Sequence, residues 1–326
     1  MKILVMGAGA IGSVFGGFLS LKPNPLQKAA GLDVSLVGRF EHMQAIKEKG
    51  LHISGIWGEY YADNLKTFAS VQEVIKGDKD FDLILLTVKS YDTREATEKI
   101  VKANLVGGNT WVISLQNGLG NLETIAEIVG KEKTVGGRVI FGAELVKPGW
   151  VKVTVYADKV ILGKAEGEPA DERLEEIAKV FTECGIPTAT TEGIEKFIWG
   201  KILYNCALNG LGTILEVPYG RLAERKESRW IMEEIIKEIF LLAKKKRVKL
   251  FWEEAGEYLK VFYDSLVPPT KEHYSSMLQD IKRGKRTEID ALNGSIVELA
   301  KKEGLSLPIN QVVTDLVKFK EKKIEG

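Results

Sequence analysis

Three glycines near the start of the chain constrain its fold more than any other feature. They lie in Gly7-Ala8-Gly9-Ala10-Ile11-Gly12, directly after the apolar run 3–6 and before a helix-like stretch at residues 13–20. In a strand–turn–helix unit, the first glycine permits a tight turn, the second lets the backbone approach a pyrophosphate, and the third permits close packing of helix on strand. The motif alone is a weak signal, but this context predicts a dinucleotide-binding unit. The alternative, glycines that tighten a turn without a ligand, stays open.

The chain changes character at about residue 190. Before that point, apolar runs at residues 33–37, 81–88 and 110–115 alternate with helical patterns, which favours a parallel sheet buried on both faces. β-rich runs between residues 134 and 163 predict antiparallel strands added to that sheet. The expected fold class is α/β, with a Rossmann-like doubly wound sheet in residues 1–190 and an all-α domain in residues 191–326.

Helical patterns fill the second domain. Gly304 lies where a helix C-cap glycine belongs, and Pro308 is placed to open the last helix. The predicted helices cover residues 228–246, 252–264, 275–283, 287–303 and 308–323, besides a buried helix around Lys201.

Composition narrows the class of protein. Lys and Arg number 46 and Asp and Glu 45, so the net charge does not point to nucleic acid or an anionic membrane. The chain starts with a strand-like run in place of a signal peptide, and no apolar run reaches about 18 residues. Cys184 and Cys206 have no metal or redox spacing. We expect a cytoplasmic, metal-free protein that binds a small molecule; monomer and homodimer both stay open.

A polar stripe marks the helix around residue 201. Lys201, Asn205 and Asn209 are spaced four apart in an otherwise apolar stretch, so a helix places them on one face. Buried polar groups need partners, because leaving them unsatisfied costs several kcal/mol. A site for a polar ligand would supply those partners, whereas a lone buried Lys is more often a paired structural charge.

The residues at the ends of the predicted strands indicate the cofactor. An NAD enzyme normally has an acid after the second strand, to bind the ribose 2′-hydroxyl. This chain has Arg39 there, and a guanidinium suits a 2′-phosphate, which predicts NADPH unless Arg39 is merely solvated. Lys89 and Asn117 follow two further strands. Asn117 either orients nicotinamide ribose or substrate, or simply forms an Asn-Gly turn.

A second polar segment lies between residues 273 and 294. Ser275 and Ser276 are natural helix N-caps, and Glu288 and Asp290 are suited to the first turn of a helix. The basic run 282–286 reads as a solvated loop or a contact for cofactor phosphates. By itself this segment does not define a function.

Taken together, these motifs resemble the ketopantoate reductase (2-dehydropantoate 2-reductase) family over nearly the whole chain. The resemblance rests on the glycine turn, Thr87-Val88-Lys89, Gln116-Asn117-Gly118, Trp199 to Asn209, Ser275 to Asp280, and Arg286 to Asp290. It implies NADPH-dependent reduction of 2-dehydropantoate to (R)-pantoate, for pantothenate and coenzyme A biosynthesis.

The resemblance also implies roles for single residues. Lys201 is the implied catalytic acid and Glu288 the second catalytic residue. Substrate contacts fall on Asn205, Asn209, Ser276 and Asn117, and cofactor contacts on Gly7 to Gly12, Arg39, Lys89, Asn117 and Glu288. One departure is Tyr219, which occupies a position where some family members have a further substrate-binding Asn. With Lys201 and Glu288 in the second domain, the active site is expected between the domains.

Two other functions remain open. The same fold would serve an NADP-dependent reductase of another 2-keto acid or of an imine. A non-catalytic sensor that binds NADP(H) and a partner belongs to a different class, and the joint presence of Lys201 and Glu288 argues against it.

Overall fold

The computed structural model describes residues 1–21, 32–77, 80–164 and 169–322, and the chain forms two compact units. The first unit comprises Met1–Gln116 and Asn121–Ile194, and the second comprises Asn117–Gly120 and Glu195–Gly326. A four-residue segment that follows a strand of the first unit therefore belongs to the second.

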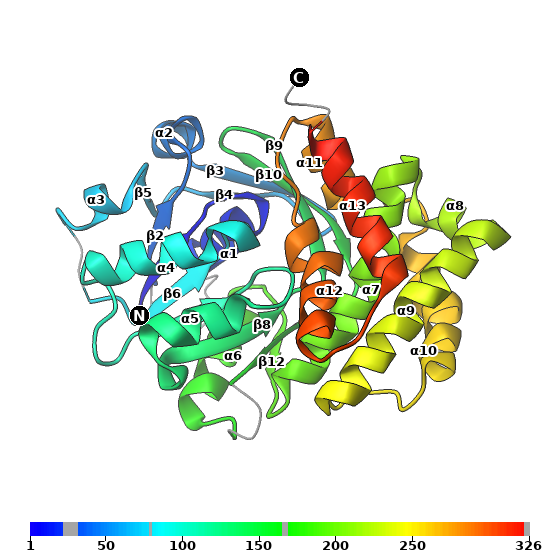
Figure 1. Ribbon diagram of the computed structural model, residues 1–326. Coiled ribbons are helices and arrows are strands. Elements are labelled where there is room, and N and C mark those ends of the chain that lie inside the picture. The colour runs from blue at the N-terminus through cyan, green and yellow to red at the C-terminus, as the bar shows by residue number, and fades with distance from the viewer. Residues whose placement is uncertain (22–31, 78–79, 165–168, 323–326) are drawn as a thin grey trace. The chain divides into compact units, whose positions relative to one another are not determined.

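The first unit is built on a sheet with helices packed against it (Figure 1). The strand order of this sheet reverses beside β1. Among the described residues the order is β12-β11-β8-β7-β6-β1-β2-β5, and β1 pairs in parallel with both β2 and β6. The strands are β1 (Lys2–Met6), β2 (Asp33–Val37), β5 (Leu65–Phe68), β6 (Leu83–Leu86), β7 (Trp111–Ser114), β8 (Thr134–Arg138), β11 (Val160–Gly163) and β12 (Thr188–Thr190). Such a reversal is where open α/β sheets bind their ligands.

Helices cover both faces of this sheet, because successive side chains of a strand point to opposite sides. In β1, Ile3 and Val5 join a core with α1 (Ala10–Ser20) and α6 (Glu172–Glu183). Leu4 and Met6 join a separate core with α3 (Val71–Val74), α4 (Thr93–Lys102) and α5 (Asn121–Val129). The predicted doubly wound sheet is thereby confirmed.

The antiparallel additions are only partly as predicted. β11 pairs antiparallel with β8 inside the main sheet. β9 (Phe141–Lys147) and β10 (Trp150–Tyr156) instead form a second sheet with β3 (Leu51–Gly55) and β4 (Tyr60–Ala62), so their predicted place in the main sheet is wrong. The buried side chains of β3 and β10 pack into the α1 core, which accounts for the separate layer.

The second unit is helical. Its elements in the described residues include α7 (Ile194–Leu215), α8 (Tyr219–Glu224), α9 (Lys226–Lys246), α10 (Ala255–Val261), α11 (Ser276–Lys282), α12 (Asn293–Lys302) and α13 (Pro308–Lys322). Gly304 follows α12 with a φ of +72° and Pro308 opens α13, both as predicted. No helix in the described ranges combines the length and apolar character that a membrane span requires.

The helix predicted over residues 287–303 is wrong at its start. A 3-10 turn, η5 (Ile289–Ala291), comes first, and α12 begins only at Asn293 after Leu292 leaves helical geometry with a ψ of −111°. The buried Asn293 side chain donates to the Cys206 carbonyl oxygen at 3.1 Å and to Asn310 Oδ1 at 3.0 Å. These bonds fix the start of α12 against α7 and α13. Glu288 therefore precedes a short turn and is not part of an α-helix.

Candidate functional site

The glycine turn after β1 is required by close contacts. Gly7 has a φ of +103°, and a Cβ there would lie 2.6 Å from the Val88 nitrogen. A Cβ on Gly12 would lie 2.5 Å from both the Gly7 oxygen and Thr87 Oγ1. Gly9 is different, because the nearest atom to a Cβ there is the Gly7 oxygen at 3.9 Å. Space around Gly9 thus remains for the close approach of a ligand.

Thr87 fixes this turn, a role that the sequence interpretation missed. Its hydroxyl donates to the Gly7 oxygen at 2.8 Å, while the Gly7 and Ala8 amides donate to the Val37 oxygen at 3.0 and 2.8 Å. The turn is therefore bonded to the ends of both neighbouring strands. The available signal was a polar residue at the end of an apolar strand.

The first turn of α1 suits a pyrophosphate. Gly9 is its N-cap and provides no side-chain hydrogen bond, and no acidic residue occupies the first turn. The amides of Ala10, Ile11 and Gly12 lie in that turn, where backbone N–H groups lack intrahelical acceptors. Oriented amides and the helix dipole together favour an anion. The residues present fit a dinucleotide.

Arg39 and Lys89 occupy corresponding places on the strands that flank β1. Arg39 follows β2, caps α2 (Phe40–Lys49) and is exposed, whereas Lys89 follows β6 and is half-buried. Both strands end at the edge of the sheet where the glycine turn lies. The segment before Lys89 is fixed by Gln116, whose Nε2 donates to the Val88 oxygen at 3.0 Å. Gln116 was also missed as a positioning residue.

The structure assembles a second polar cluster on α7. Lys201, Asn205 and Asn209 lie on this one helix, the first two partly exposed and Asn209 only 6% exposed. Lys201 Nζ donates to Asn117 Oδ1 at 2.5 Å. The lysine therefore lies beside an amide from a distant segment.

The segment Asn117–Gly120 is an Asn-Gly turn that also supplies this amide. Gly118 has a φ of +90°, and a Cβ there would lie 2.6 Å from the Ala291 Cβ. The Leu119 amide donates to the Ala291 oxygen at 2.9 Å. Asn117 therefore lies at an Asn-Gly turn, and this turn connects α7 with the segment that contains Glu288. Its contact with nicotinamide ribose or substrate stays a prediction.

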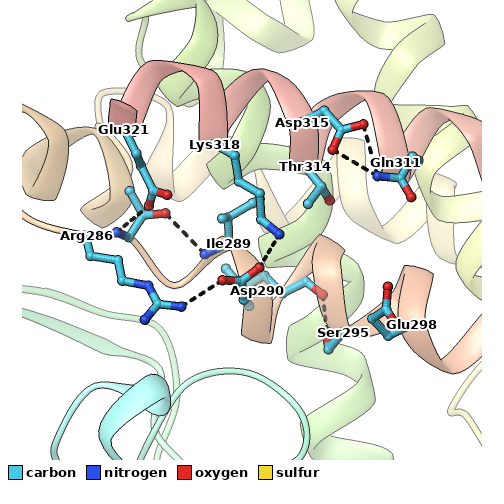
Figure 2. A network of polar contacts seen from close by, with 12 residues as sticks. Arg286, Ile289, Asp290, Ser295, Glu298, Gln311, Thr314, Asp315, Lys318 and Glu321 are labelled. Carbon is cyan, nitrogen blue, oxygen red and sulfur yellow. Dashed lines mark hydrogen bonds and ion pairs between the residues drawn. The ribbon is translucent and has the colours of Figure 1, made fainter. Parts of the chain in front are cut away.

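Glu288 lies in a segment anchored to α13. Its side chain is largely buried, at 8% exposure for the residue. The Thr287 amide donates to Glu321 Oε1 at 2.6 Å. Figure 2 shows the Asp290 carboxylate between Arg286 and Lys318, at 2.9 and 2.6 Å. Burial acts to raise the pKa of Asp290, but hydrogen bonds from Lys318 and Arg286 outweigh it and hold that pKa below its ordinary value.

Ser275 and Ser276 differ in their contacts and in their exposure. Ser275 caps α11, since its Oγ accepts from the Leu278 amide at 3.0 Å. Ser275 Oγ also forms a hydrogen bond with Thr213 Oγ1 at 2.8 Å. The Thr213 hydroxyl donates to the main-chain carbonyl oxygen of Asn209 at 2.7 Å. Ser276 is the exposed first residue of α11. This chain of bonds connects the start of α11 to the polar stripe of α7.

These features define a class of protein. A sheet that reverses beside a glycine turn binds dinucleotides, and a lysine among amides suits a small polar substrate on which negative charge develops. Together they are characteristic of a nicotinamide-dependent oxidoreductase.

Family comparison narrows the class. The ketopantoate reductase PanE/ApbA model matches residues 3–167, and the C-terminal model of the same family matches residues 193–321. The chain belongs to the ketopantoate reductase family, as its motifs suggested.

Individual relatives span the same length. A 2-dehydropantoate 2-reductase from Aquifex aeolicus is 45% identical over 98% of this chain and 97% of its own. One from Pyrococcus horikoshii is 39% identical over 98% of each chain.

Solved structures agree on the fold. A PanE/ApbA family ketopantoate reductase from Ralstonia eutropha aligns with a TM-score of 0.86 at 29% identity, covering 100% of both chains. D-mandelate dehydrogenase, solved with NADH and anilino(oxo)acetate, also aligns with a TM-score of 0.86, at 31% identity and covering 100% of this chain and 99% of its own.

Proposed function

We propose that this protein reduces the C2 ketone of 2-dehydropantoate to (R)-pantoate with NADPH, a step of pantothenate and coenzyme A biosynthesis. The name shared by its relatives supports the substrate. The observation that carries the proposal is the hydrogen bond from Lys201 to Asn117, which places a cation beside amides on a partly exposed helix face. The cytoplasmic location and the monomeric or homodimeric state stay predictions.

The first unit binds the cofactor in this proposal. The amides of residues 10–12 hold the pyrophosphate, and Lys89 contributes positive charge at the same sheet edge. The exposed guanidinium of Arg39 binds the 2′-phosphate, since its planar fork matches phosphate oxygens. When bound, the nicotinamide supplies a hydride.

The helical unit holds the substrate and moves the proton. Negative charge develops on the carbonyl oxygen during reduction, and the Lys201 ammonium stabilises that charge and donates a proton to the oxygen. Asn117 orients Lys201 Nζ through its amide oxygen. Asn205, Asn209 and Ser276 bind the substrate's polar groups, which fixes the ketone in place. Glu288, held on its anchored segment, orients Lys201 and accepts from a substrate hydroxyl.

A second candidate is the reduction of another 2-keto acid with NADH. D-mandelate dehydrogenase supports it, because that neighbour is 31% identical to this chain and was solved with NADH and anilino(oxo)acetate. The position of Arg39 argues for NADPH instead.

One steady-state experiment separates these functions. The protein is assayed with 2-dehydropantoate, 3-methyl-2-oxobutanoate and phenylglyoxylate, each with NADPH and with NADH. We expect the highest kcat/KM for 2-dehydropantoate with NADPH. A higher kcat/KM for phenylglyoxylate with NADH would establish the second candidate, and tight NADPH binding without any turnover would indicate a sensor.

A further inference from the structure

Asn209 and Tyr219 form a buried pair in the helical unit. Asn209 is 6% exposed and Tyr219 is 4% exposed. The Tyr219 hydroxyl donates to Asn209 Oδ1. Burial raises the pKa of the Tyr219 phenol well above its ordinary value, so the phenol retains its proton at neutral pH.

The backbone and ring of Tyr219 are firmly placed. Its amide donates to the His273 oxygen at 3.1 Å, and the Gly220 amide donates to the Lys271 oxygen at 2.8 Å. The His273 ring meets the Tyr219 ring edge-on, with centroids 5.3 Å apart. The phenol therefore approaches Asn209 from a fixed direction.

This hydrogen bond decides which way the Asn209 amide faces. A phenol proton in buried surroundings needs an acceptor, and the amide oxygen is the acceptor present. Turning the amide over would leave that proton unsatisfied, at a cost of about 1–3 kcal/mol. The oxygen of Asn209 is thus engaged by Tyr219.

The NH2 group of Asn209 is then left for a ligand. Within the described part of the chain, the Asn209 side chain makes no hydrogen bond besides the one from Tyr219. Asn209 also lies on the α7 stripe with Lys201. An NH2 group can only donate, so its partner must be an acceptor.

We propose that Tyr219 is a positioning residue that locks the Asn209 amide with its NH2 group toward the substrate, so that the site selects an acid that presents an acceptor oxygen there. The acceptor is a carboxylate oxygen of the 2-keto acid. This inference rests on the proposed function. Some family members have a substrate-binding asparagine at this position. The role proposed for Tyr219 is different, because the Tyr219 hydroxyl contacts Asn209.

A double-mutant cycle tests this role. We measure kcat and KM for 2-dehydropantoate with the wild type, Tyr219→Phe, Asn209→Ala and the double variant. Tyr219→Phe should raise KM roughly three- to tenfold with kcat little changed, as expected for the loss of one neutral hydrogen bond. In the Asn209→Ala background, the same change should have no further effect, because Tyr219 acts through Asn209. Independent, additive effects would overturn the inference.

The direction of the amide has its own test. In Asn209→Asp, Tyr219 still has a carboxylate oxygen to bond, but the second oxygen replaces the NH2 donor. Repulsion of the substrate's acceptor should raise KM further than Asn209→Ala does. If Asn209→Asp had the KM of the wild type, the proposed orientation would be wrong.

Tyr258→Phe is the matched control. Tyr258 is fully buried in the same unit, and its hydroxyl has no hydrogen-bond partner among the described residues. Removing that hydroxyl should leave KM and kcat unchanged. A wild type that reduces no keto acid would contradict the proposed function and this inference with it. An active wild type with an additive cycle would contradict the inference alone.

Discussion

At Lys201 a single hydrogen bond joins two residues 84 positions apart in the sequence. An ammonium on a flexible four-carbon side chain samples many positions, and the hydrogen bond to the Asn117 amide oxygen limits this freedom. In the proposed mechanism this hydrogen bond matters, because a proton donor must lie within hydrogen-bond reach of the reacting oxygen. Asn117 is then a residue that acts through Lys201.

Replacing Lys201 should slow the chemical step. We expect Lys201→Ala to lower the single-turnover rate of ketone reduction by about 10²–10⁴-fold, the usual contribution of general acid–base catalysis. Lys196→Ala is the control, since Lys196 lies on the same helix but outside the polar stripe. A loss of less than about tenfold in Lys201→Ala would exclude the role of proton donor.

Replacing Arg39 should change cofactor preference. Arg39→Ala removes a charged hydrogen-bond donor worth about 1.5–3 kcal/mol, so kcat/KM for NADPH should fall roughly tenfold or more while that for NADH stays the same. Arg94→Ala, which removes an exposed arginine paired with Glu127, is the control. An unchanged NADPH/NADH ratio in Arg39→Ala would refute the 2′-phosphate contact.

At the scale of elements, the β1–α1 turn combines two kinds of glycine. Gly7 and Gly12 are needed because neighbouring atoms leave no room for a Cβ. Gly9 has room in the protein itself, and its φ of −81° is accessible to any residue. Only the approach of a ligand would make Gly9 necessary.

The two glycines should therefore respond differently to alanine. Gly12→Ala should lower the melting temperature, because its Cβ would meet the Gly7 oxygen and Thr87 Oγ1 at 2.5 Å. Gly9→Ala should keep the wild-type melting temperature and raise the Kd for NADPH at least tenfold. Calorimetric titration and thermal unfolding measure both effects. Wild-type NADPH affinity in Gly9→Ala would show that no pyrophosphate approaches there.

His42 lies on α2 and forms hydrogen bonds with α1 and with the turn between β9 and β10. Its burial should make the packing of these three elements sensitive to pH. Its Nε2 bonds Ser13 Oγ at 2.9 Å, and its Nδ1 accepts from the Gly149 amide at 2.9 Å. Burial lowers its pKa to about 4 from 6.5. The unfolded chain therefore binds the His42 proton at higher pH than the folded protein does.

Stability should fall as the pH drops from about 6.5 to about 4, where the unfolded state alone is protonated at His42. The shift corresponds to roughly 3 kcal/mol of unfolding free energy at about 1.4 kcal/mol per pKa unit. His42→Gln should lose less stability over this range, measured by urea unfolding at several pH values. Gln44→Ala, at an exposed residue of α2 that does not titrate, should keep the wild-type pH dependence. Identical pH profiles for His42→Gln and the wild type would contradict the buried, neutral imidazole.

At the scale of the whole molecule, the proposed function gives the two units separate chemical tasks. The glycine turn, Arg39 and Lys89 belong to the first, whereas Lys201, Asn209 and Glu288 belong to the second. Asn117–Gly120 leaves the sheet of the first unit to contribute to the second. The proposed division is therefore testable by separating cofactor binding from catalysis.

NADPH should stabilise the protein independently of Lys201. At 100 times its Kd, a ligand adds about 2.7 kcal/mol of stability. Lys201→Ala should retain this NADPH-dependent rise in unfolding free energy, and Arg39→Ala should lose most of it at the same concentration. Loss of the effect in Lys201→Ala would show that cofactor binding depends on the helical unit.

Much of the fold and part of the candidate site follow from local spacing. A glycine motif predicts the β1–α1 turn, an apolar run predicts the strand at residues 33–37, and a four-residue spacing predicts the polar stripe of α7. Each of these signals lies within a short stretch of sequence. The break at Leu292 was not, since it depends on where the buried Asn293 finds its partners in α7 and α13. The second sheet escaped prediction for a similar reason, because β10 pairs with β3 from about a hundred residues away.

Short stretches of sequence encode which residue types are present and on which element each one lies: a lysine and two asparagines on one helix face, and glycines in one turn. How these groups pair depends on tertiary packing. It gave Lys201 the oxygen of Asn117 and turned the Asn209 amide by means of Tyr219. Spacing along the chain specifies a face, but a hydrogen bond between distant segments depends on which buried donors and acceptors packing brings into contact.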